Sequence, residues 1–89
     1  MEPDLIHVGF GNFIAANRVV AIVSPGSAPI QRLVREAKKK GTSRDVTQGR
    51  RTKAVVFMDD GSMMLAAISP EAIAGRVAAA GGGRVAKGD

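Results

Sequence analysis

The chain has 89 residues, the size of one small domain, and its 13 Lys and Arg against 8 Asp and Glu give a formal charge of +5. This charge favours polyanionic partners such as nucleic acid, while the absence of cysteine excludes disulfides, thiolate metal sites and cysteine nucleophiles. No apolar stretch is long enough to cross a bilayer and no basic leader precedes one, so we expect a cytoplasmic protein without membrane contact.

The N-terminal part of the chain predicts three extended segments. Residues 5–8 are typical of a short strand, which ends at the Gly-Phe-Gly-Asn sequence of residues 9–12. Residues 13–16 resume the strand after a hairpin or bulge. Residues 19–23 form a run rich in β-branched side chains and end at Ser24-Pro25-Gly26, which predicts a strand buried on both faces.

A helix follows, and its beginning and end are both marked. Ser27 is an N-cap residue and Pro29 falls in the first turn, where a missing N–H costs little. The helix closes with three lysines and Gly41, which place cations and a glycine stop at the negative end of the helix dipole. The apolar residues recur at the spacing of one helical face, at Ile30, Leu33, Val34 and Ala37.

The second half of the chain predicts a further set of strands. After a polar link at residues 42–44 we expect a short strand over residues 45–48 and a longer one over residues 52–58. The Asp-Asp-Gly-Ser sequence of residues 59–62 predicts a tight type I′ hairpin turn, and residues 63–68 return as the antiparallel partner strand.

The C-terminal part predicts a second helix and a tail. Ser69 is the N-cap, Pro70 the first helical residue and Glu71 an acid at the positive end of the dipole, and a narrow apolar face follows. We expect one folded domain over residues 1–78 and a disordered, Gly-rich basic tail over residues 79–89.

These elements predict an α+β fold: a small, curved, mostly antiparallel sheet or partial barrel with one central helix and a short C-terminal helix. Residues 19–23 and 63–68 show no polar alternation, so both faces of those strands need cover. Two modest helices cover one face well and the other only partly, which favours a homo-oligomer. The alternative is that the sheet curls into a barrel and buries its own second face.

The sequence contains few residues that could act in catalysis. His7 is the only histidine and lies between apolar residues of a strand, where a structural role is the usual one. The hairpin turn already explains Asp59 and Asp60, and no glycine-rich nucleotide loop is present. We therefore expect no catalytic residue, metal site, cofactor or small-molecule substrate.

Basic residues remain as the candidates for binding. Arg18 precedes the first long strand, and Arg50, Arg51 and Lys53 cluster beside Gly49. Arginine forks suit phosphate oxygens, and no acid lies within four residues of the Arg50-Arg51 pair on either side. A turn or a bulge at Gly49 would let both side chains reach solvent. The spacing alone favours neither of two interpretations: that these side chains contact a polyanion, or that they are exposed to solvent without a binding role.

Several separated motifs, taken together, resemble the RemA family of small bacterial regulators of extracellular-matrix (biofilm) genes. The resemblance covers residues 5–77. Gln48, where the family has an aromatic residue, and Gly26, where it often has an acid, are local departures that leave the arginines untouched. The motifs are His7–Asn12, Ala16–Pro25, Ser27–Ile30 and Gly49–Val55.

The resemblance implies a DNA-binding transcriptional regulator that assembles into a ring, with duplex DNA wrapped against its outer basic surface. Carried over by position, it implies that Arg18, Arg50 and Arg51 contact DNA, with Lys53 in the same basic cluster, and that Pro29 is a structural residue near the subunit contact.

Two other classes stay open: an RNA-binding module, and a structural or protein-interaction ring without nucleic acid. The absence of Trp and Tyr argues against single-strand binding, which uses aromatic stacking. The Arg50-Arg51 pair argues against the second class.

Overall fold

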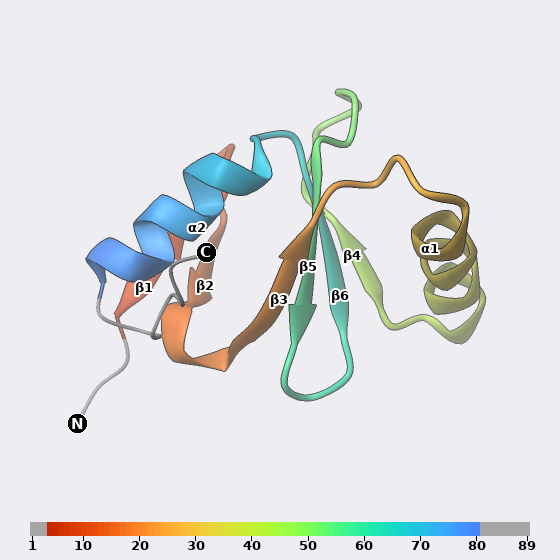
Figure 1. Cartoon of the computed structure of the whole chain (residues 1–89), viewed down its shortest axis with the longest axis horizontal. Helices are drawn as coiled ribbons and strands as arrows, with labels where there is room; N and C mark the ends of the chain where they lie inside the picture. The colour runs from red at the N-terminus through yellow and green to blue at the C-terminus, as the bar shows by residue number, and fades with distance from the viewer. Residues whose placement is uncertain (1–3, 81–89) are drawn as a thin grey trace, which may run out of the picture.

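The structure is a computed structural model that describes residues 4–80, and it confirms the α+β class (Figure 1). Within these residues three strands precede each of the two helices, and a 3₁₀ turn, η1, lies between the second and third strands. In chain order the elements are β1 (Leu5–His7), β2 (Phe13–Ala15), η1 (Ala16–Arg18), β3 (Val19–Val23), α1 (Ala28–Lys40), β4 (Ser43–Asp45), β5 (Ala54–Met58), β6 (Met63–Ala66) and α2 (Pro70–Ala79).

The strands form two sheets. Strands β1 and β2 pair as an antiparallel hairpin, which confirms the predicted turn at residues 9–12. The other four strands form a sheet in the order β3-β5-β6-β4, in which only the β4–β6 pair is parallel. Strands β3 and β4 are its edges, so the sheet stays open and does not bury its own second face by closing.

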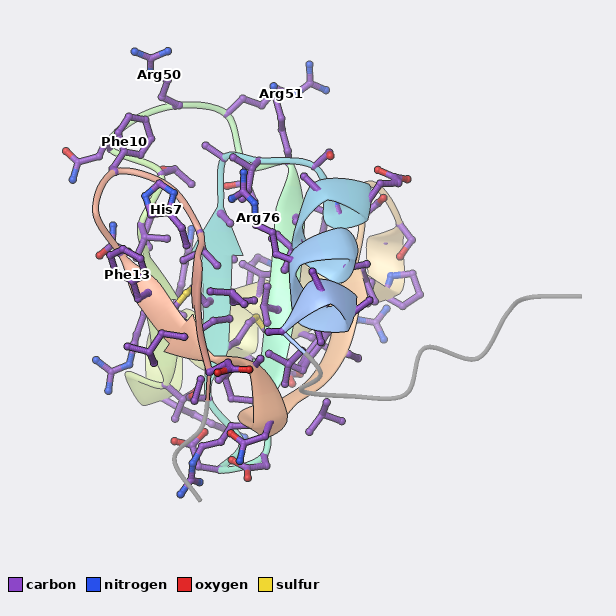
Figure 2. All side chains as sticks on the ribbon, turned by 90° about the vertical axis from the view of Figure 1, so that its left-hand side faces the viewer. His7, Phe10, Phe13, Arg50, Arg51 and Arg76 are labelled. Carbon is purple, nitrogen blue, oxygen red and sulfur yellow. The ribbon has the colours of Figure 1, made fainter. Side chains whose placement is uncertain are left out.

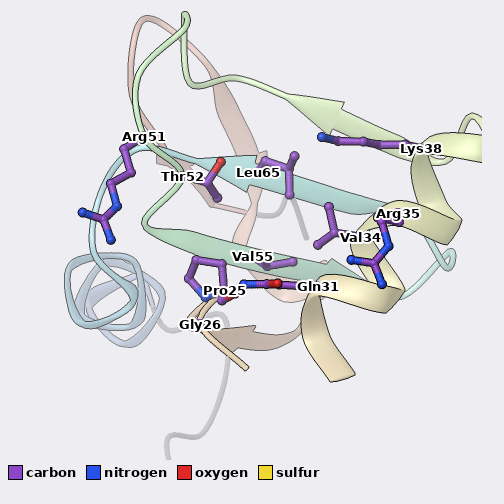
Figure 3. A pocket seen from close by; sticks show the side chains of 10 residues that line it. All are labelled: Pro25, Gly26, Gln31, Val34, Arg35, Lys38, Arg51, Thr52, Val55 and Leu65. Carbon is purple, nitrogen blue, oxygen red and sulfur yellow. Dashed lines mark hydrogen bonds between the residues drawn. The ribbon is translucent and has the colours of Figure 1, made fainter. Parts of the chain in front are cut away.

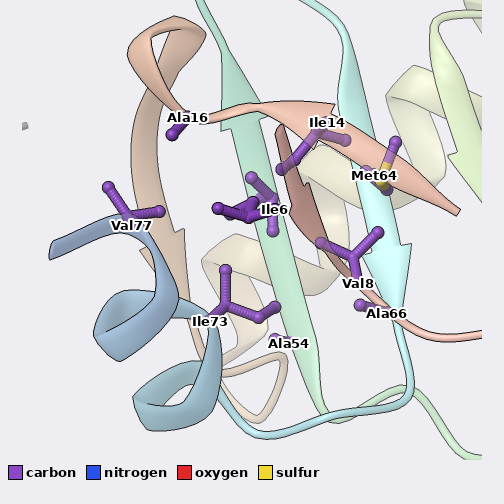
Figure 4. Close-up of a cluster of buried hydrophobic side chains, with 10 residues drawn as sticks. Ile6, Val8, Ile14, Ala16, Ala54, Met64, Ala66, Ile73 and Val77 are labelled. Carbon is purple, nitrogen blue, oxygen red and sulfur yellow. The ribbon is translucent and has the colours of Figure 1, made fainter. Parts of the chain in front are cut away.

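The four-stranded sheet lies between two layers of different kind. The β1–β2 hairpin and α2 cover one face, and α1 lies against the other (Figure 1). Residues of β5 alternate between them: Ala54 and Val56 face the hairpin and α2, while Val55 faces α1. Strand β6 is buried along its whole length, as its continuous apolar pattern predicts. The larger cluster, shown in Figure 4, is Ile6, Val8, Ile14, Ala16, Ala54, Val56, Met64, Ala66, Ile73 and Val77.

Strand β3 corrects the sequence prediction, because it is not buried on both faces. Its pairing with β5 shifts register between Val19 and Ala21, so Val20 is the extra residue of a bulge. The Val20 side chain is 67% exposed, and the rest of the strand is only half-buried. An apolar run at a sheet edge therefore remains partly uncovered.

Both helices begin as predicted, and α1 also ends as predicted. The Ser27 hydroxyl accepts a hydrogen bond from the Ile30 N–H, and Gly41 ends α1 in the left-handed conformation with φ of 75°. The Ser69 hydroxyl likewise accepts from the Ala72 N–H at the start of α2. Helix α2 runs one residue past the predicted domain boundary at residue 78, and the predicted tail lies, from residue 81 on, outside the described residues. No helix within residues 4–80 has the length and apolarity to cross a membrane.

The hairpin between β5 and β6 lies where it was predicted, but its turn is of another type. A type I′ turn needs positive φ at both central residues, and Gly61 alone has one, of 86°. The Gly61 N–H donates to the Met58 carbonyl, and Asp60 accepts from the Ser62 N–H. This is a three-residue loop with glycine in the left-handed position, which the aspartate side chain stabilises.

Strand β4 also differs from the prediction, because it occupies residues 43–45 and not 45–48. The chain after it turns sharply: Gln48 and Gly49 both have positive φ, of 55° and 78°, and the Arg50 N–H donates to the Thr47 carbonyl. This geometry is that of a type I′ turn, so residues 47–50 cannot continue a strand.

The Asp45 side chain holds the first half of that turn. Its carboxylate accepts hydrogen bonds from the Thr47 hydroxyl at 2.6 Å and from the Thr47 N–H at 2.9 Å. These two bonds, in that order, and the nearby charge of Lys38 lower the pKa of Asp45 below its ordinary value. Hydrogen bonds from Ser62 lower the pKa of Asp60 in the same way. Both turns are thus tied to charged carboxylates.

We predict that Asp45→Asn weakens the acid dependence of stability. The folded-state pKa of Asp45 lies below an unfolded-state value of about 3.9, so the charged carboxylate stabilises the fold above that pH. This contribution disappears as the pH falls through the lower folded-state pKa, and asparagine has no proton to titrate. Urea unfolding at a series of pH values measures the effect. The variant's free energy of unfolding is expected to fall less on acidification, with Asp60 supplying part of the remainder; identical pH dependence in the two proteins would contradict the prediction.

Candidate nucleic-acid interface

The arginine pair follows the type I′ turn that joins β4 to β5. The turn is anchored at Thr47, which is 2% exposed and bonded to Asp45, and it reverses the chain immediately before Arg50. Figure 2 shows both arginine side chains extending outward from the same end of the molecule. The turn at Gly49 thus lets Arg50 and Arg51 both reach solvent, as predicted, where a regular strand would have sent them to opposite faces.

The two guanidinium groups have different surroundings. Arg50 lies over the ring of Phe10, with 5.6 Å between its Cζ atom and the ring centroid. Arg51 lies at one end of a groove between α1 and the sheet. Neither side chain forms an ion pair within residues 4–80. Both cations are therefore free to accept an anionic partner.

The groove beside Arg51 has a volume of about 430 Å³, an apolar floor and a cationic rim (Figure 3). Val34, Val55 and Leu65 line its floor. Arg35 and Lys38 stand at one end, and Arg51 stands at the other. No carboxylate is among the described residues that line it.

Arg35 and Lys38 were not singled out as site residues from the sequence. They lie three residues apart on α1, so they share a face, and that spacing was the available signal. The way in which α1 docks on the sheet determines which face of the helix lines the groove. It also determines that Arg51 comes to the same groove.

The tip of the β1–β2 hairpin stands beside the arginine loop. Phe10 is 47% exposed there, and sequence reasoning did not single it out as a site residue. His7 has the structural contacts expected of it: its Nε2 accepts from the Gly11 N–H at 3.2 Å, and its ring lies 5.1 Å from that of Phe13. Arg76 of α2 donates to the His7 carbonyl at 2.6 Å and so ties the hairpin to the helix.

The structure does not bring Arg18 to the arginine pair. Arg18 precedes β3 where Val19 pairs with Met58, at the end of β5 remote from the Arg50-Arg51 loop. Its Nη1 lies 3.1 Å and 3.3 Å from the two carboxylate oxygens of Asp59, on an exposed surface. The predicted contact residues thus occupy two separate places.

The two other predicted residues are also exposed. Lys53 lies between Arg51 and β5, and its backbone N–H donates to the Ala66 carbonyl, so the loop rejoins the sheet at that point. Pro29 lies in the first turn of α1. Within residues 4–80 no three His, Asp or Glu side chains gather as a metal site would require.

Three bacterial proteins are similar to this chain over most of its length. A protein of Dehalococcoides mccartyi strain 195 is 52% identical over 85 residues, which are 96% of this chain and 88% of the relative. One of Synechococcus elongatus is 57% identical over 77 residues, 86% of this chain and 88% of its own. One of Symbiobacterium thermophilum is 53% identical over 78 residues, 88% and 82% of the two chains. All three carry the name "Putative regulatory protein". The family described as extracellular matrix regulatory protein A-like matches residues 5–77, and the chain therefore belongs to this RemA-like family of regulatory proteins.

Proposed function

We propose that this regulatory protein binds duplex DNA and controls transcription of extracellular-matrix genes as a ring-shaped homo-oligomer at the nucleoid. The observation that carries the proposal is the exposed Arg50-Arg51 pair, which a fixed turn presents outward and which forms no ion pair among the described residues. Planar guanidinium forks bind phosphate oxygens bidentately, and a formal charge of +5 draws the chain towards polyanions.

Assembly into a ring explains how so small a subunit binds DNA with sufficient affinity. One subunit makes few phosphate contacts, but a ring repeats the same arginines at regular intervals along one bent duplex. The summed contacts offset the cost of bending, and sequence preference then arises mainly from DNA deformability.

Incomplete cover of the apolar surface supports assembly. Leu5 is 64% exposed, Val20 67% and Leu33 43%. Strands β3 and β4 are open edges of the sheet, and exposed apolar residues near an edge favour pairing with another chain. Pro29, at the exposed start of α1, belongs near this subunit contact.

The oligomer is the first expected result. Light scattering after size exclusion is predicted to give a mass well above that of a dimer of 9.2 kDa subunits, because exposed apolar surface is removed from water in a closed assembly. A clean monomer at micromolar concentration would contradict both the packing argument and the ring.

The arginine pair is tested by the double variant Arg50→Ala/Arg51→Ala. Removing one arginine–phosphate interaction lowers the slope of log affinity against log salt by about 0.9, because one condensed counterion fewer is released on binding. Anisotropy of a labelled duplex over a salt series measures the slope, and light scattering checks that the oligomer persists.

The matched control removes the same charge from the outward side of α1, as Arg32→Ala/Lys39→Ala, and is expected to change affinity much less. If the arginine double variant binds DNA with unchanged affinity and slope, the proposed function is wrong. If it dissociates, the pair belongs to the subunit interface. Stronger binding of duplex RNA than of the same DNA sequence would favour the RNA-binding class instead.

Arg18 makes a second, separable prediction through its partner. The Asp59 carboxylate competes with phosphate for the Arg18 guanidinium, so Asp59→Asn is expected to raise duplex affinity and Arg18→Ala to lower it. Exposed ion pairs contribute only about 0–1 kcal/mol, so the melting temperature should change little. In the Arg18→Ala background the Asp59→Asn change should have a much smaller effect. An equal gain with and without Arg18 would show that only overall charge matters.

A further inference from the structure

Phe10 has a backbone conformation that is unfavourable for a bulky residue. Its φ is 54°, between Gly9 at 107° and Gly11 at 77°, so three consecutive residues lie in the positive region. Glycine adopts this region freely, whereas an aromatic residue there is strained. With 47% of the residue exposed, burial recovers only part of that cost. Strain of this kind persists where the surroundings enforce it, and it points to a function for the side chain.

A dense set of hydrogen bonds enforces the conformation. Asn12 is its centre, because its backbone and its side-chain amide both bind the tip, and His7 adds one bond from the strand. The bonds are Val8 N–H to the Asn12 carbonyl at 2.9 Å, Asn12 N–H to the Gly9 carbonyl at 3.0 Å, Asn12 Nδ2 to the Gly9 carbonyl at 2.9 Å and the Phe10 carbonyl at 3.3 Å, and Gly11 N–H to His7 Nε2 at 3.2 Å. The hairpin thus fixes the direction in which the Phe10 side chain leaves the backbone.

That direction brings the ring to Arg50. The two residues lie forty positions apart in the sequence, yet the Arg50 Cζ atom is 5.6 Å from the ring centroid, within the range of a cation–π contact (Figure 2). We propose that Phe10 is a positioning residue, which holds the Arg50 guanidinium in the orientation that receives a DNA phosphate. The inference rests on the proposed function and adds a residue that acts through Arg50.

The aromatic ring of Phe10 and a DNA phosphate do not compete for the same part of the Arg50 guanidinium. A ring that stacks on a guanidinium takes its flat face, while the N–H donors that bind phosphate lie along its edge. A neighbouring ring also restricts the rotamers of a long side chain, so phosphate binding costs less conformational entropy. Arg51 has no such aromatic partner among the described residues, so the two arginines of the pair should differ in their dependence on position 10.

The test exchanges the aromatic ring for an apolar side chain without a π face. Phe10→Leu is expected to lower duplex affinity about two- to fivefold for each engaged subunit, as an exposed cation–π contact implies. The salt slope should stay near that of the parent, because Arg50 still reaches phosphate. Phe10→Tyr keeps the aromatic face and should restore affinity. Phe13→Leu is the matched control: this phenylalanine of the same hairpin is 57% exposed and contacts His7.

A double-mutant cycle with Arg50→Ala then isolates the coupling. The effect of Phe10→Leu should vanish once Arg50 is alanine and persist in an Arg51→Ala background. If Phe10→Leu keeps full affinity while Phe10→Ala loses affinity, the side chain at position 10 acts as an apolar wedge inserted into the DNA. That result would overturn the positioning role. Equal reductions in the Leu and Tyr variants, with a lower melting temperature, would reduce Phe10 to a structural tip residue. If Phe10→Leu binds normally while Arg50→Ala/Arg51→Ala does not, this inference fails and the proposed function stands; if the arginine variant also binds normally, the proposed function fails.

Discussion

The fold depends on the burial of the β5–β6 hairpin on both of its faces. Val55 and Val56 are fully buried although they point in opposite directions, and β6 is buried along its whole length. Water must therefore be excluded from both sides of two central strands, which supply much of the apolar area that a small domain can bury. One layer consists of the β1–β2 hairpin and α2, and the other is α1.

Such an arrangement uses most of the chain to cover two strands and leaves the edges exposed. Strand β3 bulges outward at Val20, and β4 is only three residues long. The arginines predicted to contact DNA lie at the two ends of β5, with Arg50 and Arg51 before it and Arg18 beside the hairpin that follows it. The central strands thus hold apart two exposed basic sites, with the open edges of the sheet between them.

The arginine loop is held in place from two directions. On one side Asp45 and Thr47 fix the turn that carries it. On the other side the β1–β2 hairpin, tied to α2 through Arg76 and the His7 carbonyl, brings Phe10 to Arg50. A surface arginine ordinarily loses considerable side-chain entropy when it binds. Here the layer that covers the sheet also orients the cation, which links the packing of the domain to its proposed binding surface.

The sequence by itself determined the features that depend on neighbouring residues. Ser27 and Ser69 cap their helices, Gly41 ends α1, and the β-branched runs became β3 and β5, because capping, turn propensity and strand propensity act within a few residues. The turn that exposes Arg50 and Arg51 was predicted on the same local grounds.

Tertiary structure alone decided the parallel pairing of β4, the bulge at Val20, the pairing of Arg18 with Asp59, and the approach of Phe10 to Arg50. Each of these joins segments far apart in the chain, so no local propensity specifies it and only the packing of the layers against the sheet brings the partners together.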